Sequence, residues 1–353
     1  MLIEKEYLKL SEILYYLQRF GDLNPEIISA ISRIRDAENF IQWLRENYHY
    51  RLYPIPRYEA LGLKKYYVTI YSNYYRLHLL DFYDAFDGNT TLIFRDVNNP
   101  LVINAVIYYN STNFDKVLDY LQDEGIIFHY DIHKIEKEEF YPIDYSTFNF
   151  NKGVFEGLLS SPREPFELPD LTEDFSPDDL DVKILGKKQA RADISLKDLS
   201  SLLGVSFKDV LYHTQAHVIG KGLIKGYNVY LYKPDFRLEV NFKEEEVLEE
   251  LSKIPSMYYV YKLDDKSYVA HILDSSFTLL SYLKFISSLK EKDTIETYLH
   301  PTDNDYAIIA SIPYEHFEEG RWNFNTEVMM LRAEKLVKKI EKEEKNKKEE
   351  KNN

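Results

Sequence analysis

The stretch Ile194-Ser-Leu-Lys-Asp-Leu-Ser-Ser-Leu-Leu203, followed by Gly204-Val-Ser206, decides the fold of this chain. Its leucines recur at steps of three and four, which predicts a helix with one apolar face. The turn after it ends in the N-cap residue Ser206, and Asp209 three residues later favours the start of another helix. Two short helices joined by a tight turn are typical of a helix-turn-helix.

The flanking residues extend this motif into a winged helix-turn-helix over residues 178–233. A first helix is predicted at 180–189, and the helix that begins after Ser206 is predicted to run to about Ile219. Residues 223–232 are rich in β-branched and aromatic side chains and predict a strand that would serve as a wing.

The next segment, residues 234–330, predicts a ferredoxin-like α+β domain. Strand-like and helix-like patterns follow one another in the order β-α-β-β-α-β, which is the split βαβ arrangement. The strands are expected at 237–242, 257–263, 267–273 and 295–300, and the helices at 247–254 and 277–289.

The first half of the chain repeats this order, so we predict an α+β protein built from two copies of a winged helix-turn-helix followed by a ferredoxin-like domain. The first copy spans a divergent winged helix at 1–57 and an α+β domain at 58–155. Even the ends correspond, since Ile143-Asp-Tyr145-Ser-Thr-Phe148 matches Ile312-Pro-Tyr314-Glu-His-Phe317. An acidic, proline-rich linker is expected at 156–177, and a charged tail, helical and then disordered, at 331–353.

Charge is distributed unevenly along the chain. The net charge is −15, yet the segment from Val182 to Lys233 holds nine basic and three acidic residues. Local neutralisation of phosphates matters more for DNA affinity than the total charge, so this segment keeps DNA binding possible. Cysteine is absent, which excludes disulfides, thiolate catalysis and cysteine-bound zinc.

Composition also bears on where the protein acts. No apolar run approaches the roughly 20 residues that cross a bilayer, and the N-terminus lacks the layout of a signal peptide. We therefore expect a cytoplasmic protein without a membrane partner. The 31 tyrosines, with abundant Lys, Glu, Ile and Asn, are compatible with an archaeal-like thermophile.

The second winged helix resembles the N-terminal domain of the Lrp/AsnC transcription regulators, through Leu180-Asp-Val-Lys-Ile-Leu185, Leu203-Gly-Val-Ser206 and Gly222-Leu-Ile-Lys-Gly-Tyr227. Tyr58-Glu-Ala-Leu-Gly-Leu63 looks like the connector of that family. The resemblance implies double-stranded DNA as a partner and an α+β domain that pairs with another copy, here as self-association or an intramolecular pseudo-dimer. It also implies a possible small-molecule effector. This chain departs from the family at Lys188 and at Ile31-Ser-Arg-Ile34, which replaces the Gly-Val-Ser turn.

A recognition helix presents one apolar face to its core and one polar face to the major groove. In the second copy, the predicted DNA-binding residues are Ser206, Lys208, Tyr212, His213, Gln215, Lys221 and Lys225. In the first copy they are Arg33, Arg35, Asn39, Gln42, Arg45 and Arg51. The alternative is that both sets are ordinary solvated side chains or surface ion pairs.

His213 and His217 stand at i and i+4, a spacing by which one helix can offer two imidazoles to a metal. The sequence shows no third ligand nearby, so we expect a structural or DNA-side role for the pair and no metal.

The resulting hypothesis is a DNA-binding transcription regulator that is not an enzyme and needs no cofactor. One alternative is a winged-helix module that docks on proteins and has lost DNA binding. Another follows from siroheme decarboxylases, which resemble Lrp/AsnC proteins and use His and Arg-rich tetrapyrrole contacts in the strand pair of the α+β domain. Here the strand pair carries His271 but lacks a basic cluster.

Overall fold

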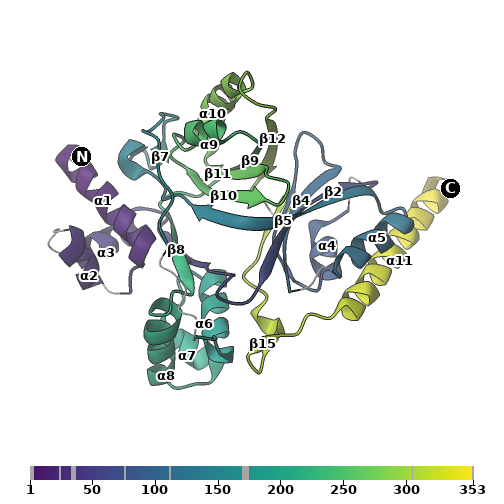
Figure 1. Ribbon diagram of the computed structural model, residues 1–353, viewed down its shortest axis with the longest axis horizontal. Helices are drawn as coiled ribbons and strands as arrows, with labels where there is room; N and C mark the ends of the chain where they lie inside the picture. Colours follow the sequence, from purple (N-terminus) through teal and green to yellow (C-terminus); the bar gives the residue numbers. More distant parts are fainter. Residues whose placement is uncertain are drawn as a thin grey trace.

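The computed structural model describes residues 4–23, 25–32, 37–74, 77–110, 113–168, 175–303 and 305–351. It has the expected α+β architecture, with two winged helix-turn-helix units and a large antiparallel sheet (Figure 1). No helix among these residues combines the length and the apolar character needed to cross a membrane.

The two winged-helix units have matching elements. The first consists of α1 (Glu4–Phe20), α2 (Pro25–Ser32), α3 (Ala37–Asn47) and β1 (Arg51–Pro56). The second consists of α6 (Asp179–Ala190), α7 (Leu196–Leu203), α8 (Phe207–Tyr212), the π-helix η2 (His213–Ile219) and β8 (Ile224–Tyr230). Gly204 ends α7 with φ of +67°, a conformation that glycine adopts without steric cost, and the Ser206 side chain caps α8.

Each α+β unit has the predicted strand and helix order. The first consists of β2 (Lys64–Ser72), α4 (Leu79–Ala85), β3 (Thr90–Arg95), β4 (Val102–Tyr109), α5 (Asp115–Asp123) and β5 (Ile127–Phe140). The second consists of β9 (Phe236–Phe242), α9 (Glu245–Leu251), β10 (Met257–Leu263), β11 (Tyr268–Asp274), α10 (Ser276–Leu289) and β12 (Glu296–Pro301).

The long strand β5 joins the two units. Among the described residues, nine strands form one sheet in the order β12-β9-β11-β10-β5-β2-β4-β3-β13, where β13 is Ala307–Ile309. One end of β5 pairs with β2, and the other end, from Ile135 to Phe140, pairs with β10. The sequence predicts a strand over residues 126–133, which covers only the first of these ends.

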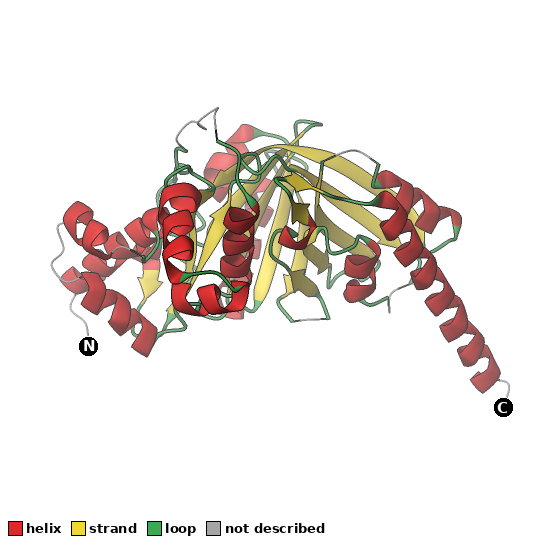
Figure 2. Ribbon diagram, turned by 90° about the horizontal axis from the view of Figure 1, so that it is seen from below, coloured by secondary structure: helices red, strands yellow, loops and turns green. Residues whose placement is uncertain are grey.

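Helices cover one face of this sheet, and the sheet curves around its other face (Figure 2). Side chains of α4, α5 and α11 (Thr326–Lys351) pack on the first unit, and those of α9 and α10 pack on the second. The curvature brings the opposite edges together, because the Val97 amide donates to the Leu299 carbonyl at 2.9 Å. The inner face therefore encloses a small apolar cluster that contains Tyr67, Val106 and Tyr261.

Two expectations differ from the structure. Residues 223–232 form no wing hairpin; β8 instead pairs antiparallel with β1 of the other winged helix, from Arg51 opposite Tyr230 to Pro56 opposite Ile224. The backbone N–H and C=O groups of the two strands thus pair with each other in one shared ribbon, instead of in two separate wings. The charged tail is helical to Lys351, since Met329, Ala333 and Leu336 are buried against the first α+β unit.

Candidate functional site

A cavity of about 560 Å³ lies between the β1–β8 ribbon and the inner face of the sheet; we refer to it as the ribbon cavity. Both halves of the chain contribute to it, because β1, β2, β3 and β5 come from the first and α6, β8, β9, β10, β11 and β13 from the second. Its basic lining residues are His49, Arg51, Lys65 and Arg237, and its tyrosines are Tyr53, Tyr108, Tyr230, Tyr232, Tyr258, Tyr259 and Tyr261. The volume lies within the range of small-molecule sites.

Arg237 is the most unusual group in the ribbon cavity. It sits on β9, is only 4% exposed, and its guanidinium carbon lies 4.3 Å from the centre of the Phe94 ring. No carboxylate oxygen of a described residue lies within salt-bridge distance of it, and its Nε atom has no hydrogen-bond partner there. A buried cation normally has an anionic partner, so this arginine is suited to bind the carboxylate of a ligand.

A second buried group links the ribbon to the sheet. Glu138 of β5 accepts from Lys65 of β2 at 2.6 Å and from Lys225 of β8 at 2.9 Å. Burial alone would raise the pKa of Glu138, but the two ammonium groups lower it to about 2. Burial lowers the pKa of Lys65, but the charge and hydrogen bond of Glu138, together with Tyr108 and Glu59, outweigh this effect and raise that pKa. The two lysines thus share the Glu138 carboxylate, and Lys225 also lies 3.0 Å from Glu59.

Tyr258 on the wall of the ribbon cavity is a neutral hydrogen-bond donor. Burial raises the pKa of Tyr258 to about 12, and the Glu239 charge adds to the rise while Arg237 opposes it. The Tyr258 hydroxyl is buried and has no partner among the described residues. At the rim, burial and then the charges of Arg51 and Lys233 lower the pKa of His49. The potential at the rim is thus positive, which favours an anionic ligand.

Behind the ribbon cavity lies a buried cluster around Glu239. Its two carboxylate oxygens lie 3.2 Å from His271 Nδ1 and 3.2 Å from His300 Nε2, and Asn104 donates to it at 2.7 Å. Burial lowers the pKa of His271, and Glu239 opposes this by hydrogen bonding. His271, the histidine noted in the strand pair under the siroheme decarboxylase alternative, is fully buried and is not among the residues that line the ribbon cavity.

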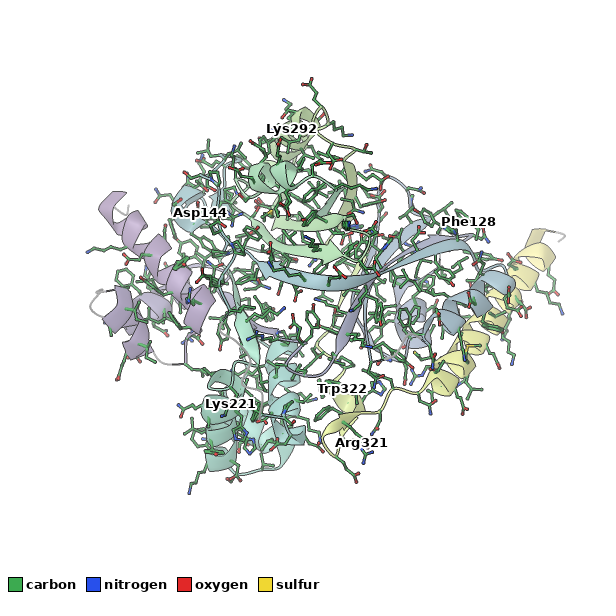
Figure 3. All side chains as sticks on the ribbon, viewed as in Figure 1. Phe128, Asp144, Lys221, Lys292, Arg321 and Trp322 are labelled. Carbon is green, nitrogen blue, oxygen red and sulfur yellow. The ribbon has the colours of Figure 1, made fainter. Side chains whose placement is uncertain are left out.

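The structure separates the predicted DNA-binding residues of the second copy. Ser206, Lys208, Tyr212, Gln215 and Lys221 are exposed on α8, η2 and the turn after it. Figure 3 shows Lys221 on the second winged helix, away from the sheet. The predicted role of Lys225 is wrong, because its side chain is 1% exposed and bound to Glu138. His213 faces inward to Asp181 at 2.8 Å and does not point to a groove.

In the first copy, Asn39, Gln42 and Arg45 are exposed on α3. Gln42 donates to Glu46 at 2.7 Å, and Arg45 pairs with Asp22 at 2.6 Å. Arg51 lines the ribbon cavity. Arg33 and Arg35 lie outside the described residues.

The expectation that His213 and His217 lack a third ligand is also wrong. Asp178 and Asp181, at the start of α6, lie beside the two histidines, and donor atoms of all four residues fall within 4.8 Å of one another. These carboxylates are distant in sequence, at the start of the second winged helix, where the first helix was predicted at 180–189.

Sequence analysis missed the basic lining residues Lys65, Arg237 and His49. Arg237 and Glu239 alternate with the apolar residues of β9, a pattern that usually marks a solvent-facing strand surface. The alternation itself was visible, but only the curvature of the sheet shows that its polar side faces inward.

Comparison with known proteins identifies the architecture. No protein-family model and no curated protein matches the chain. Two solved structures of siroheme decarboxylase NirDL match it with a TM-score of 0.50, at 12% identity for one and 11% for the other, which is in co-complex with an iron-uroporphyrin III analogue. Each likeness covers 94% of this chain and 99% of the other.

At this level of identity the likeness establishes the fold alone, which is compatible with an Lrp/AsnC-type arrangement. It overturns the prediction that the chain is not an enzyme, because the domain order on which that prediction rested is that of siroheme decarboxylase.

Proposed function

We propose that this chain binds a carboxylate-bearing tetrapyrrole in the ribbon cavity and removes CO₂ from it, as the name siroheme decarboxylase describes for the proteins that share its architecture. The observation that carries the proposal is Arg237, a buried cation on the cavity wall without a carboxylate partner among the described residues.

The lining of the ribbon cavity matches the chemistry of such a ligand. A macrocycle offers flat aromatic surface, which the tyrosine rings of β8 and β10 can stack against. Its acetate and propionate side chains are anions, and guanidinium groups bind carboxylates through two parallel hydrogen bonds. Arg237 lies at the inner wall and Arg51 on the ribbon, so the cavity offers cations on two sides.

Decarboxylation places a further demand on the site. The bond between the methylene carbon and the carboxylate breaks, CO₂ leaves, and the electron pair remains on the carbon, which then takes a proton. The change is redox-neutral and requires a proton donor near the reacting carbon. Tyr258, with a free buried hydroxyl, and Lys65, held charged by Glu138, are the donors that the ribbon cavity provides.

Anaerobic incubation of the full-length protein with siroheme, followed by mass spectrometry of the tetrapyrrole, tests the reaction. The expected result is a product lighter by one or more CO₂, formed by the wild type and by Arg321→Gln, whose side chain is 72% exposed on β15 (Arg321–Trp322) (Figure 3). Arg237→Gln should form product far more slowly. Siroheme that stays intact with folded wild-type protein would contradict the proposed reaction.

A second candidate function is DNA binding by the second winged helix. It is supported by the exposure of Lys208 and Lys221 on an outer surface that also carries Gln215. Lysines of this kind can contact phosphates, and a glutamine can pair with adenine. The two functions use different surfaces of the molecule, so they can be tested separately.

A further inference from the structure

The second winged helix contains a cluster of four metal-ligand side chains that the ribbon cavity does not use. Asp178 and Asp181 belong to the first turn of α6, and His213 and His217 project from η2. His213 Nδ1 lies 2.8 Å from Asp181 Oδ1, and His217 Nδ1 lies 3.1 Å from the same oxygen. Asp178 Oδ1 is 3.6 Å from His213 Nδ1.

We propose that Asp178, Asp181, His213 and His217 bind one divalent transition-metal ion, with zinc as the preferred occupant. The set offers two imidazole nitrogens and two carboxylate oxygens, a donor set that zinc accepts in tetrahedral geometry. With neutral histidines the cluster carries two negative charges, which a divalent cation would balance. Imidazole ligands select against calcium and magnesium, and the absence of cysteine leaves no thiolate alternative.

The ligands are already oriented by the surrounding backbone. Asp178 Oδ1 accepts from the amides of Leu180 and Asp181, at 2.9 and 3.0 Å, as the cap of α6. The Asp178 amide in turn donates to Asp181 Oδ2 at 3.1 Å. Outer hydrogen bonds of this type hold metal-binding carboxylates in place.

Three of the four side chains are shielded from solvent. The Asp181 side chain is 1% exposed, those of His213 and His217 are 17% and 22% exposed, and only Asp178, at 54%, is exposed. The rings of Tyr212 and Phe175 lie within 5.3 Å of the His217 ring and shield it from solvent. The histidines also lie on a π-helix, a rare helical form that occurs frequently at functional sites.

A second cluster in the protein provides an internal comparison. His133, Asp264 and Asp265 also bring three donors together, but both aspartates are exposed and only one imidazole is present. It lacks the buried, hydrogen-bonded carboxylate of the first cluster, so we expect it to bind no zinc of comparable affinity.

A bound metal would join the start of α6 to η2. The opposite end of α6 lines the ribbon cavity at Gln189, and a helix of this length spans about 18 Å. The metal is therefore structural in this arrangement, because it would hold η2, between Lys208 on α8 and Lys221 in the following turn, without contacting a ligand in the cavity. Binding to the folded form alone would raise the unfolding temperature.

Zinc titration of the chelator-treated full-length protein against a chromophoric competitor tests the site. We expect one equivalent to bind the wild type and His133→Ala, with a rise in unfolding temperature. His213→Ala and His217→Ala should weaken binding by more than the roughly 10–100-fold loss that removal of an outer-shell partner causes. Equal zinc affinity in these variants and the wild type, or no bound equivalent in the wild type, would overturn the proposal.

A measurement on unmodified protein guards against variants that fail to fold. X-ray absorption of the zinc-loaded wild type should show four nitrogen or oxygen neighbours, with the outer-shell scattering of two imidazoles. A six-oxygen spectrum without imidazole scattering would place the metal elsewhere and overturn the proposal as well.

Discussion

The ammonium group of Lys225 lies 2.9 Å from the Glu138 carboxylate, and this contact connects the second winged helix to the sheet of the first half. Lys65 completes the group from the neighbouring strand β2, at 2.6 Å from the other carboxylate oxygen. Lys225 was predicted to face DNA, but its charge is buried inside the molecule. There it holds the β1–β8 ribbon over the ribbon cavity.

Glu138→Gln should destabilise the protein strongly. The substitution keeps the shape of the side chain but leaves the buried Lys65 without a carboxylate partner and Lys225 with only Glu59, whose side chain is 42% exposed. Breaking a buried ion pair in this way costs about 3–5 kcal/mol. Urea unfolding at neutral pH measures the loss. The neighbouring Glu139→Gln, which removes a carboxylate paired with the exposed Lys137, is the matched control and should cost at most about 1 kcal/mol. Equal losses in the two variants would contradict the importance of the buried group.

The same carboxylate should leave a signature in acid. The pKa of Glu138 is about 2 in the folded protein against 4.5 for an unperturbed glutamate, so its stabilising effect is complete above pH 4.5 and is lost as the pH falls towards 2. The difference in unfolding free energy between wild type and Glu138→Gln should therefore shrink over that interval. A difference that stays constant down to the acid transition would show that the folded pKa is not lowered.

Tyr258→Phe should separate binding from stability. The Tyr258 hydroxyl is buried without a partner among the described residues, so its removal should leave the unfolding temperature unchanged or raise it. Affinity for iron-uroporphyrin III should fall about tenfold or more if the hydroxyl bonds to a ligand carboxylate. Tyr145→Phe is the control and should lower the unfolding temperature without changing the affinity. Tyr145 donates to the Val229 carbonyl at 2.6 Å and does not line the cavity. Unchanged affinity in Tyr258→Phe would remove this tyrosine from the site.

Alanine at both Lys208 and Lys221 tests the DNA-binding candidate. The double variant should bind DNA more weakly than the wild type in gel-shift titrations at several salt concentrations. The probe is duplex DNA from the region upstream of the gene that encodes this protein. A plot of log affinity against log salt concentration has a negative slope. The magnitude of this slope should decrease by about 2, one for each lost phosphate contact. Lys292→Ala, an exposed lysine on the far side of the sheet, should leave the slope unchanged (Figure 3). No salt-sensitive shift with the wild type would exclude this function.

Ser206→Ala should cost stability whether or not DNA binds. The Ser206 hydroxyl accepts from the Asp209 amide at 3.1 Å and caps α8, and loss of such a cap costs about 1 kcal/mol. Ser201→Ala, whose exposed hydroxyl only donates to its own helix, should stay within about 0.5 kcal/mol of wild type. Unfolding by urea distinguishes them, and equal stabilities would mean that Ser206 does not cap the helix.

Local signals made the helices and strands of both repeats predictable. The turn at Gly204 and the cap at Ser206 depend on neighbouring residues only, and the strand predicted at 257–263 has the bounds of β10. The pairing between strands that are distant in the sequence has no such local signal. The last part of β5, with Glu136, Lys137 and Glu138 in succession, has the composition of a surface segment, yet it pairs with β10.

The ribbon cavity was unpredictable for the same reason. Polar residues at alternate positions of β9 suggest a solvent-exposed face of the strand. No neighbouring residue reveals that the strands of the first α+β unit curve over this face. Glu239 and His271 face each other across the β9–β11 pairing, whereas Asn104 of β4 contacts Glu239 only because the sheet is curved. The pairing of β1 with β8 then closes the cavity with a ribbon to which each winged helix contributes one strand.

A titration of the wild type and Arg237→Gln with iron-uroporphyrin III, followed by the shift of its main absorption band, tests the ribbon cavity most directly. We predict saturable binding of one molecule per chain by the wild type and by Arg321→Gln. Affinity in Arg237→Gln should be lower by about 10–100-fold, the value of a charge-assisted hydrogen bond of roughly 1.5–3 kcal/mol. Equal affinity in Arg237→Gln and the wild type, or no saturable shift with any of the three proteins, would contradict the assignment of this cavity as the tetrapyrrole site.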